Sequence, residues 1–266
     1  MNILVTNDDG IDSPGLWALA EAMSRVGDTL VVAPDSERSG SGTCFSLHSD
    51  TTVEEVPTTI PHVEAYAVGG TPSDCVVLGI RRLSGNRHID LLVSGINPGG
   101  NMGRDIPYSG TVMATLQGHF RRIPSIAMSL AILTRDKKPD YSVAATVAEH
   151  LARRIEGGSL PSDAILNVNV PDIPMEEIKG IVTTRTAADG WVRLMPVISE
   201  GGTRFVSSTR AAGVDLPEGT DMWAVTSGRI SITPLRMEVT HHEGIPLLAE
   251  HLPGLESDLL GRREHV

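Results

Sequence analysis

Short apolar runs alternate with amphipathic segments through the first two thirds of the chain, and this alternation limits the folds that the chain can adopt. The apolar runs are typical of buried strands, at 2–6, 29–33, 63–68, 89–93, 125–130 and 164–170. Between them, hydrophobic residues recur at helical spacing in segments that begin near Pro14, Pro72 and Gly110 and in 141–155. Strands and helices in this succession predict a three-layer α/β/α, Rossmann-like fold with a mostly parallel sheet.

The pattern changes after about Pro171. We expect strands at 178–184 and 229–234, and a hairpin whose arms, 191–197 and 204–208, flank Glu200-Gly201-Gly202. Two leucine-rich stretches, 247–252 and 255–260, are interrupted by Pro253 and Gly254. We therefore interpret residues 1–266 as a single domain. Its α/β core is 1–175, and 176–266 adds a β-hairpin extension, a final core strand and a C-terminal tail.

The balance of charge argues against a nucleic-acid polymer as a partner. Lys and Arg number 22 against 33 Asp and Glu, which gives a formal net charge of −11. Such a chain repels polyanions. With three each of Phe, Tyr and Trp, a base-stacking platform for single strands is also disfavoured. A small anionic substrate stays compatible, because a bound metal ion can reverse the local charge of a site.

Nothing in the sequence indicates export or insertion into a membrane. No apolar run approaches the roughly 20 residues that a membrane-spanning helix needs. The first residues, MNILVTNDDG, lack the basic start and the cleavage site of a signal peptide. The two cysteines, Cys44 and Cys75, show no CxxC spacing. The expectation is a cytoplasmic protein without a membrane partner.

The strongest chemical feature is the acidic pair Asp8-Asp9, which follows the first expected strand and precedes Gly10. Ligands of parallel sheets bind beyond the carboxyl ends of the strands, and Gly10 permits the turn that lets neighbouring side chains converge. Two close carboxylates repel unless a proton or a cation lies between them, and hard divalent cations prefer oxygen ligands. An isolated pair more often caps a helix or stays solvated, but the position at a strand end favours a metal site.

Two further loops follow expected strands. The first, Ser39-Gly40-Ser41-Gly42, offers hydroxyl and amide groups, although by itself it is typical of an ordinary loop. The second contains Asn97 and Asn101 among glycines that permit close approach of a ligand. Neither loop is a P-loop or a dinucleotide fingerprint, because GxxxxGK[ST] and the third glycine are missing.

A helix that begins at Ser109-Gly110-Thr111 would point its N-terminus at the same edge of the sheet. Free N–H groups and positive potential there suit a phosphate, while Ser109 also suits a plain N-cap. Carboxylates, neutral oxygens and this helix start together favour metal-assisted hydrolysis of a phosphate ester. Asp8 or Asp9 would orient a water molecule or take its proton. Zinc is disfavoured, since there is no HExxH motif.

Five ordered segments carry a more specific likeness: MNILVTNDDGIDSPGL, SERSGSGT, GGTPSDCV, VSGINPGGNMG and YSGTVMA, with TDMWAVTSGRISITPL near the end. Together they resemble the SurE family of survival-protein nucleotidases. The resemblance implies a 5′-nucleotidase, a divalent-metal-dependent phosphomonoesterase that converts nucleoside 5′- and 3′-monophosphates to nucleoside and phosphate. Some members of the family also trim short polyphosphate.

The resemblance also implies roles for particular residues. One divalent ion per subunit, Mg²⁺ or Mn²⁺, would be bound by Asp8, Asp9, Ser39 and Asn97, and the two aspartates would be catalytic. The phosphate pocket would be lined by Asn101, Ser109, Gly110 and Thr111. A homodimer or homotetramer is implied as well, because hairpin and tail are exchanged between protomers in that family.

Two other functions stay open on the residues alone. A nucleoside hydrolase also places acidic residues after a first strand and binds a cation, but it cleaves the sugar–base bond. It would release adenine from AMP, whereas a phosphatase would release phosphate. A non-catalytic nucleotide or metal sensor would bind AMP without turnover.

Overall fold

The computed structural model describes residues 1–46, 50–133, 138–159, 165–190, 192–199, 202–209 and 216–260 of the chain. It divides into two units, Met1–Leu235 and Arg236–Val266. The first unit contains the sheet and its covering helices, and the second contains the helix α6 (Gly244–Leu260). The candidate site lies in the first unit.

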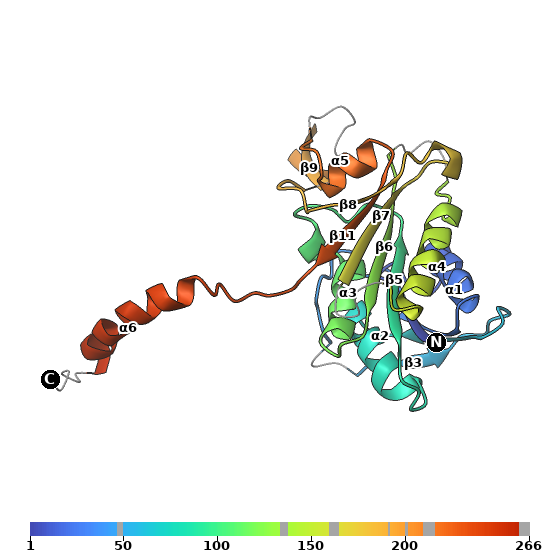
Figure 1. The fold of residues 1–266 in the computed structure, drawn as a ribbon, viewed down its shortest axis with the longest axis horizontal. Helices are drawn as coiled ribbons and strands as arrows, with labels where there is room; N and C mark the ends of the chain where they lie inside the picture. The colour runs from blue at the N-terminus through green and yellow to red at the C-terminus, as the bar shows by residue number, and fades with distance from the viewer. Residues whose placement is uncertain are drawn as a thin grey trace. The chain divides into compact units, whose positions relative to one another are not determined.

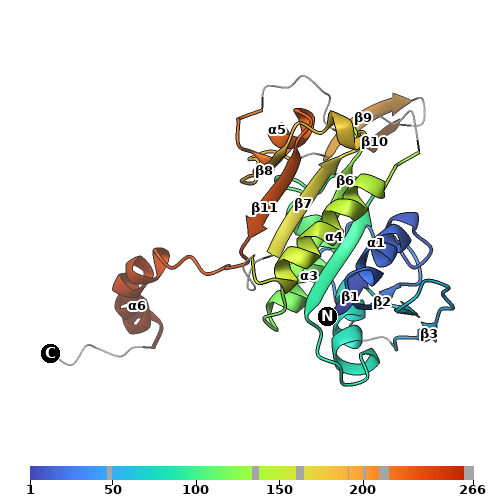
Figure 2. The same ribbon diagram turned by 45° about the vertical axis from the view of Figure 1, so that its right-hand side comes forward.

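A nine-stranded sheet runs through the first unit in the order β3-β4-β2-β1-β5-β6-β7-β11-β8 (Figures 1 and 2). The strand pairs from β4 to β7 are parallel, whereas β3 and β11 run antiparallel to β4 and β7. The mostly parallel sheet is therefore confirmed. The strands are β1 (Asn2–Thr6), β2 (Asp28–Pro34), β3 (Val53–Glu55), β4 (Val63–Val68), β5 (Leu91–Asn97), β6 (Ser125–Ala131), β7 (Ile165–Pro171), β8 (Ile181–Thr183) and β11 (Ile230–Leu235).

Helices cover both faces of this sheet. Along β1, Ile3 and Val5 pack into one hydrophobic cluster and Leu4 packs into another, as the alternation of side chains along a strand requires. The first cluster includes residues of α1 (Pro14–Ser24) and α4 (Ser142–Glu156), which lie together on one side of the sheet (Figures 1 and 2). The second includes residues of α2 (Pro72–Leu78) and α3 (Gly110–His119). The three-layer α/β/α architecture is confirmed.

Local sequence explains where these helices begin. Pro14 occupies the first turn of α1, where its missing N–H costs nothing. Thr71 and Asp74 form a capping box at the start of α2, in which the Thr71 hydroxyl accepts from the Asp74 N–H at 3.2 Å. At the start of α3, the Ser109 hydroxyl accepts from the Val112 N–H at 3.1 Å. The helix starts expected at all three places are confirmed.

Several short elements were not expected from the sequence: β3, the helix α5 (Asp221–Thr226), the π-helical turn η1 (Gly79–Leu83) and two 3₁₀ turns, η2 (Ile106–Tyr108) and η3 (Met175–Glu177). The strand expected at 178–184 is shorter, because only Ile181–Thr183 pairs with β11. The expected hairpin forms from β9 (Val192–Ser199) and β10 (Gly202–Thr209), paired antiparallel. Its expected turn residues, 200 and 201, lie outside the described residues.

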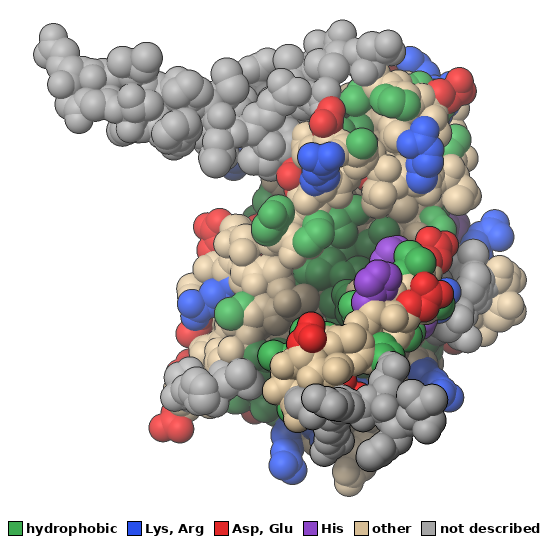
Figure 3. All heavy atoms as spheres, turned by 90° about the vertical axis from the view of Figure 1, so that its left-hand side faces the viewer, with side chains coloured by type: hydrophobic (Ala, Val, Ile, Leu, Met, Phe, Trp, Pro, Cys, Tyr) green, Lys and Arg blue, Asp and Glu red, His purple; other side chains and the backbone are tan. Residues whose placement is uncertain are grey.

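The second unit corrects one expectation. The leucine-rich stretches are not interrupted at Pro253, because α6 runs from Gly244 to Leu260 with Pro253 inside it. A proline removes one backbone hydrogen bond and crowds the preceding turn, so it bends a helix without having to end it. Leu248, Leu252 and Leu255 of α6 are exposed. Figure 3 shows hydrophobic side chains over the middle of one face, with acidic, basic and histidine side chains among and around them.

No helix in the described ranges combines the length and the apolar character needed to cross a membrane.

Candidate functional site

The acidic pair lies at the carboxyl end of β1, between the neighbouring strands β2 and β5. Asn7, the residue before the pair, is buried. Its Oδ1 accepts from the Gly10 N–H at 3.2 Å, and its Nδ2 donates to the Gly10 carbonyl at 3.0 Å. Gly10 has a φ of +98°, a conformation that disfavours any residue with a Cβ. This tight turn directs Asp8 into the protein, where it is buried, and leaves Asp9 half-buried.

The loop after β2 is fastened beside this pair. The Arg38 N–H donates to the Asp8 carbonyl at 2.7 Å, and the Gly42 N–H donates to the Tyr108 carbonyl at 3.1 Å. These bonds join the loop to the segment after β1 and to Tyr108 at the end of η2, just before α3. Ser39 is exposed between them, and its hydroxyl donates to Glu37 Oε1 at 2.8 Å. The structure therefore brings the Ser39 loop to the strand end that carries Asp8.

The N-terminus of α3 directly contacts the acidic pair. The Thr111 hydroxyl donates a hydrogen bond to Asp8 Oδ1, and both residues are buried. A Cβ added at Gly110 would lie 2.8 Å from Asp8 Cβ and 2.8 Å from Ser41 Oγ, so a side chain at this position would collide with its neighbours. The absence of a side chain at Gly110 lets the N–H end of the helix reach the Asp8 carboxylate.

Asn97 and Asn101 lie in the loop that ends β5. The Asn97 amide nitrogen donates to the Gly99 carbonyl at 2.7 Å, so Oδ1 is the side-chain atom left for a cation. Asn97 makes no hydrogen bond to Asp8 or Asp9 in the described part of the chain. Asn101 is held by β6 and β7: its amide nitrogen donates to Ser129 Oγ at 2.9 Å, and its N–H donates to Asn169 Oδ1 at 2.8 Å. Its position is thus fixed by buried polar residues of two further strands.

Burial and mutual repulsion shape the electrostatics of the pair. Burial raises the pKa of Asp8, although hydrogen bonds from Thr111 oppose that shift. The pKa of Asp9 is raised to about 7, first by burial and then by the negative charges of Asp8 and Glu37. Near neutral pH this group of carboxylates therefore favours either a bound proton or a bound cation.

The residues present fit a hard divalent cation. Asp9 Oδ2 is buried and has no hydrogen-bond partner among the described residues, an arrangement that a buried polar atom rarely keeps without a ligand. Carboxylate, hydroxyl and amide oxygens are the donors that such ions prefer. Within the described ranges no three His, Cys, Asp or Glu side chains converge on a metal position. A cation here would therefore rely on the neutral oxygens of Ser39 and Asn97.

Two residues near the pair were missed by the sequence analysis. Glu37 contributes to the raised pKa of Asp9. It lies two residues before Ser39, so its place beside that loop was the available signal. Tyr141 lies near enough for Asp9 to help raise its pKa, after burial as the main cause. Nothing in the sequence links Tyr141 to this site, because the fold alone brings the start of α4 there.

Comparisons with known proteins agree with this architecture. The chain matches the family model described as "Survival protein SurE" over residues 3–193. It is 44% identical over 251 residues to "5'-nucleotidase SurE" of Geobacter sulfurreducens, covering 93% of this chain and 92% of that protein. For the protein of the same name from Heliobacterium modesticaldum, the identity is 39% over 267 residues, with coverages of 99% and 96%. A crystal structure of the SurE protein from Aquifex aeolicus matches with a TM-score of 0.81 at 35% identity, covering 94% of this chain and 99% of that one.

Proposed function

The chain belongs to the SurE family of survival proteins, and we propose that it is a divalent-metal-dependent 5′-nucleotidase that hydrolyses nucleoside monophosphates to nucleoside and phosphate. The activity is the one that its relatives' names carry. The observation that carries the proposal is the contact between Asp8 and the N-terminus of α3. It sets a carboxylate suited to a cation beside N–H groups suited to a phosphate. We extend the proposal to 3′-monophosphates and short polyphosphate, which present the same phosphoryl group.

In this proposal one Mg²⁺ or Mn²⁺ per subunit is held by Asp8, Asp9, Ser39 and Asn97. When bound, such an ion polarises a phosphoryl oxygen and activates water. Asp8 Oδ1 already accepts from Thr111, whereas Asp9 Oδ2 has no partner among the described residues. Asp9 is therefore the residue that orients the attacking water or takes its proton.

The phosphate is bound by the first turn of α3. The backbone N–H groups of Gly110 and Thr111 belong to this turn and hydrogen-bond to Asp8. In this proposal they also stabilise the charge on the transferring phosphoryl group. Ser109 holds this turn in place through its N-cap bond to Val112. In this proposal Asn101, which hydrogen bonds hold to β6 and β7, contacts the phosphate from the side opposite α3.

The direct test is product analysis with the purified full-length protein. AMP, 3′-AMP and p-nitrophenyl phosphate are each incubated with EDTA, Mg²⁺, Mn²⁺ or Zn²⁺, and both phosphate and adenine are measured. We expect phosphate release that requires a divalent ion and favours the nucleotides. Free adenine would identify a nucleoside hydrolase instead, and binding of AMP without any product would identify a sensor.

We also propose that the protein forms a homodimer or homotetramer through its hairpin and its C-terminal tail. The support is the surface of α6, where Leu248, Leu252, Leu255 and Leu259 follow one another at helical spacing and are 47–73% exposed. Exposed apolar stripes of this kind are typical of surfaces that another chain covers.

A further inference from the structure

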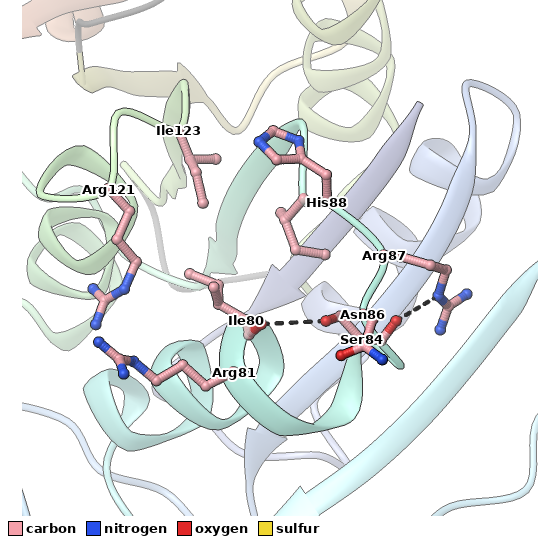
Figure 4. A pocket seen from close by; sticks show the side chains of 9 residues that line it. Ile80, Arg81, Ser84, Asn86, Arg87, His88, Arg121 and Ile123 are labelled. Atoms are coloured by element: carbon pink, nitrogen blue, oxygen red, sulfur yellow. Dashed lines mark hydrogen bonds between the residues drawn. The ribbon is translucent and has the colours of Figure 1, made fainter.

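A pocket separate from the candidate site lies at the end of the sheet opposite the acidic pair. It has a volume of about 440 Å³, within the range of small-molecule sites. Ile89 and Ile123, each two residues before β5 or β6, line it together with Arg81 of η1 and Arg121, which follows α3 (Figure 4). The ten residues of α3 separate this pocket from Gly110, a distance of about 15 Å at 1.5 Å per residue.

Four basic side chains line this pocket, and two of them are neutralised within the chain. Arg87 makes two hydrogen bonds of 2.9 Å to the carboxylate of Glu64. His88 Nδ1 lies 2.9 Å from Asp90 Oδ1. Glu64 of β4 and Asp90, just before β5, thus each pair with one basic side chain of the pocket.

The other two basic side chains, Arg81 and Arg121, are not neutralised. No carboxylate lies within 4.0 Å of either guanidinium in the part of the chain that the structure describes. Among the described residues, Arg121 donates only to the uncharged Gln117, at 2.6 Å to its carbonyl and 3.1 Å to its side chain. Figure 4 shows the two guanidinium groups next to one another at one side of the pocket, away from His88 and Arg87. Two neighbouring cations in a chain of net charge −11 form a local site of the opposite sign.

We propose that this pocket is a second ligand site, which binds the phosphate of a small organic phosphate between Arg81 and Arg121. A phosphomonoester carries nearly two negative charges at neutral pH, which matches two unpaired guanidinium groups. The planar donor fork of arginine suits phosphate oxygens better than a point charge does.

The rest of the pocket suits the organic part of such a ligand. Ile80 and Ile123 lie on the apolar side of the pocket (Figure 4), and Ile89 adds to this apolar wall. A nucleoside monophosphate combines the required phosphate with a flat heterocycle that could lie on this wall. The π-helical turn that carries Arg81 is a conformation that recurs at functional sites. This proposal does not depend on hydrolysis at the acidic pair.

The test is equilibrium dialysis of AMP against the full-length protein in EDTA, which separates binding from metal-dependent turnover. Arg81→Gln and Arg121→Gln are each expected to weaken binding at this site about ten-fold, as the loss of a charge-assisted hydrogen bond does. At an AMP concentration about three times the Kd of the unsubstituted protein, occupancy of the site should fall from about 0.76 to about 0.24, so each variant binds about half an equivalent fewer. Any AMP held at the acidic pair adds equally to all variants and cancels from this difference.

The matched control is Arg82→Gln, which removes the same charge from the neighbouring exposed position that does not line the pocket. Arg81→Lys keeps the charge and should retain part of the binding. Equal binding by Arg81→Gln, Arg121→Gln and Arg82→Gln would overturn the proposal. Adenosine binding as tightly as AMP would exclude a phosphate clamp, and inorganic phosphate binding as tightly as AMP would exclude a role for the apolar wall. Thermal melting verifies that each variant is folded.

Discussion

At the scale of single residues, the two neighbouring aspartates are not equivalent. Asp8 is buried, and its Oδ1 is held by Thr111. Asp9 keeps a buried Oδ2 without a partner among the described residues, and its pKa is raised to about 7. One carboxylate is therefore positioned by the protein, and the other is left for a ligand or a proton.

This difference predicts the effect of Asp9→Asn. The substitution keeps the size of the side chain but removes the charge and the proton acceptor, so phosphate release from AMP at saturating Mn²⁺ should fall about 10²- to 10⁴-fold. Asp12→Asn, at an exposed position of the same loop, is the matched control and should keep its activity. Full activity in the Asp9→Asn protein would contradict the role assigned to Asp9.

The raised pKa of Asp9 also predicts how stability depends on pH in metal-free protein. An unfolded Asp has a pKa of about 3.9, and the folded Asp9 has a pKa of about 7. Between these values the folded state holds a proton that the unfolded state has released, so raising the pH favours unfolding. In EDTA, the urea midpoint should therefore fall between about pH 4 and pH 7.

The same experiment needs two comparisons. The Asp9→Asn protein has no titratable carboxyl at this position. Its urea midpoint should therefore fall less over the same pH range. Excess Mn²⁺ should counteract the loss, because an ion that binds only the folded state stabilises it. An equal fall in the Asp9→Asn protein would show that other groups cause the pH dependence.

The residues of the candidate site that could be predicted are those that follow strands. Asp8, Asp9, Asn97 and the start of α3 each follow an apolar run, so the topology of a parallel sheet already directs them to one edge. Tyr141 could not be predicted in this way, because its proximity to Asp9 depends on how α4 packs across the sheet. Such tertiary proximity leaves no local pattern in the sequence.

At the scale of elements, α3 connects the two ends of the molecule that bear candidate sites. Its first turn contacts Asp8, and Arg121 follows its last turn. The positive N-terminal end of the helix therefore lies at the acidic pair, where an anionic substrate would be bound. The Arg121 side chain in turn donates to the Gln117 carbonyl in the last turn of the helix.

The close approach of α3 to the acidic pair predicts the effect of Gly110→Ala. The new methyl group would lie 2.8 Å from both Asp8 Cβ and Ser41 Oγ, and such overpacking costs about 1–3 kcal/mol of unfolding free energy. The helix must also shift, so KM for AMP should rise. Gly157→Ala is the control, because its added Cβ meets no atom closer than 3.4 Å. Urea denaturation and initial rates check both, and equal stability of the two variants would contradict the expected collision.

The elements that the sequence predicted are those with strong periodicity or clear caps, such as β1, β5 and α4. Those it missed are short. α5 has six residues and β3 has three, too few for a hydrophobic period to emerge. α5 is held instead by Asp221, which is buried and accepts from the N–H groups of Gly103 and Ala187 at 2.8 and 2.9 Å. Such long-range contacts override weak local preference.

At the scale of the whole molecule, the two candidate sites lie at opposite ends of the strands and differ in charge. Asp8, Asp9 and Glu37 follow β1 and β2, whereas Arg81 of η1 and Arg121 after α3 lie near the amino ends of β5 and β6. The net charge of −11 hides this separation, because it averages over the chain. The first site requires a cation before it can bind a phosphate, and the second offers its own positive charge.

The exposed leucines of α6 predict that assembly depends on the second unit. Leu248, Leu252, Leu255 and Leu259 form one stripe, and burying such side chains against another chain is worth about 1.5–3 kcal/mol each. The double substitution Leu252→Glu, Leu255→Glu in the full-length chain should therefore shift the oligomer to smaller species, as measured by size-exclusion chromatography with light scattering. Glu250→Gln, at an exposed position of the same helix, should leave the mass unchanged. If the double variant keeps the oligomeric mass, the stripe is not the contact that holds the subunits together.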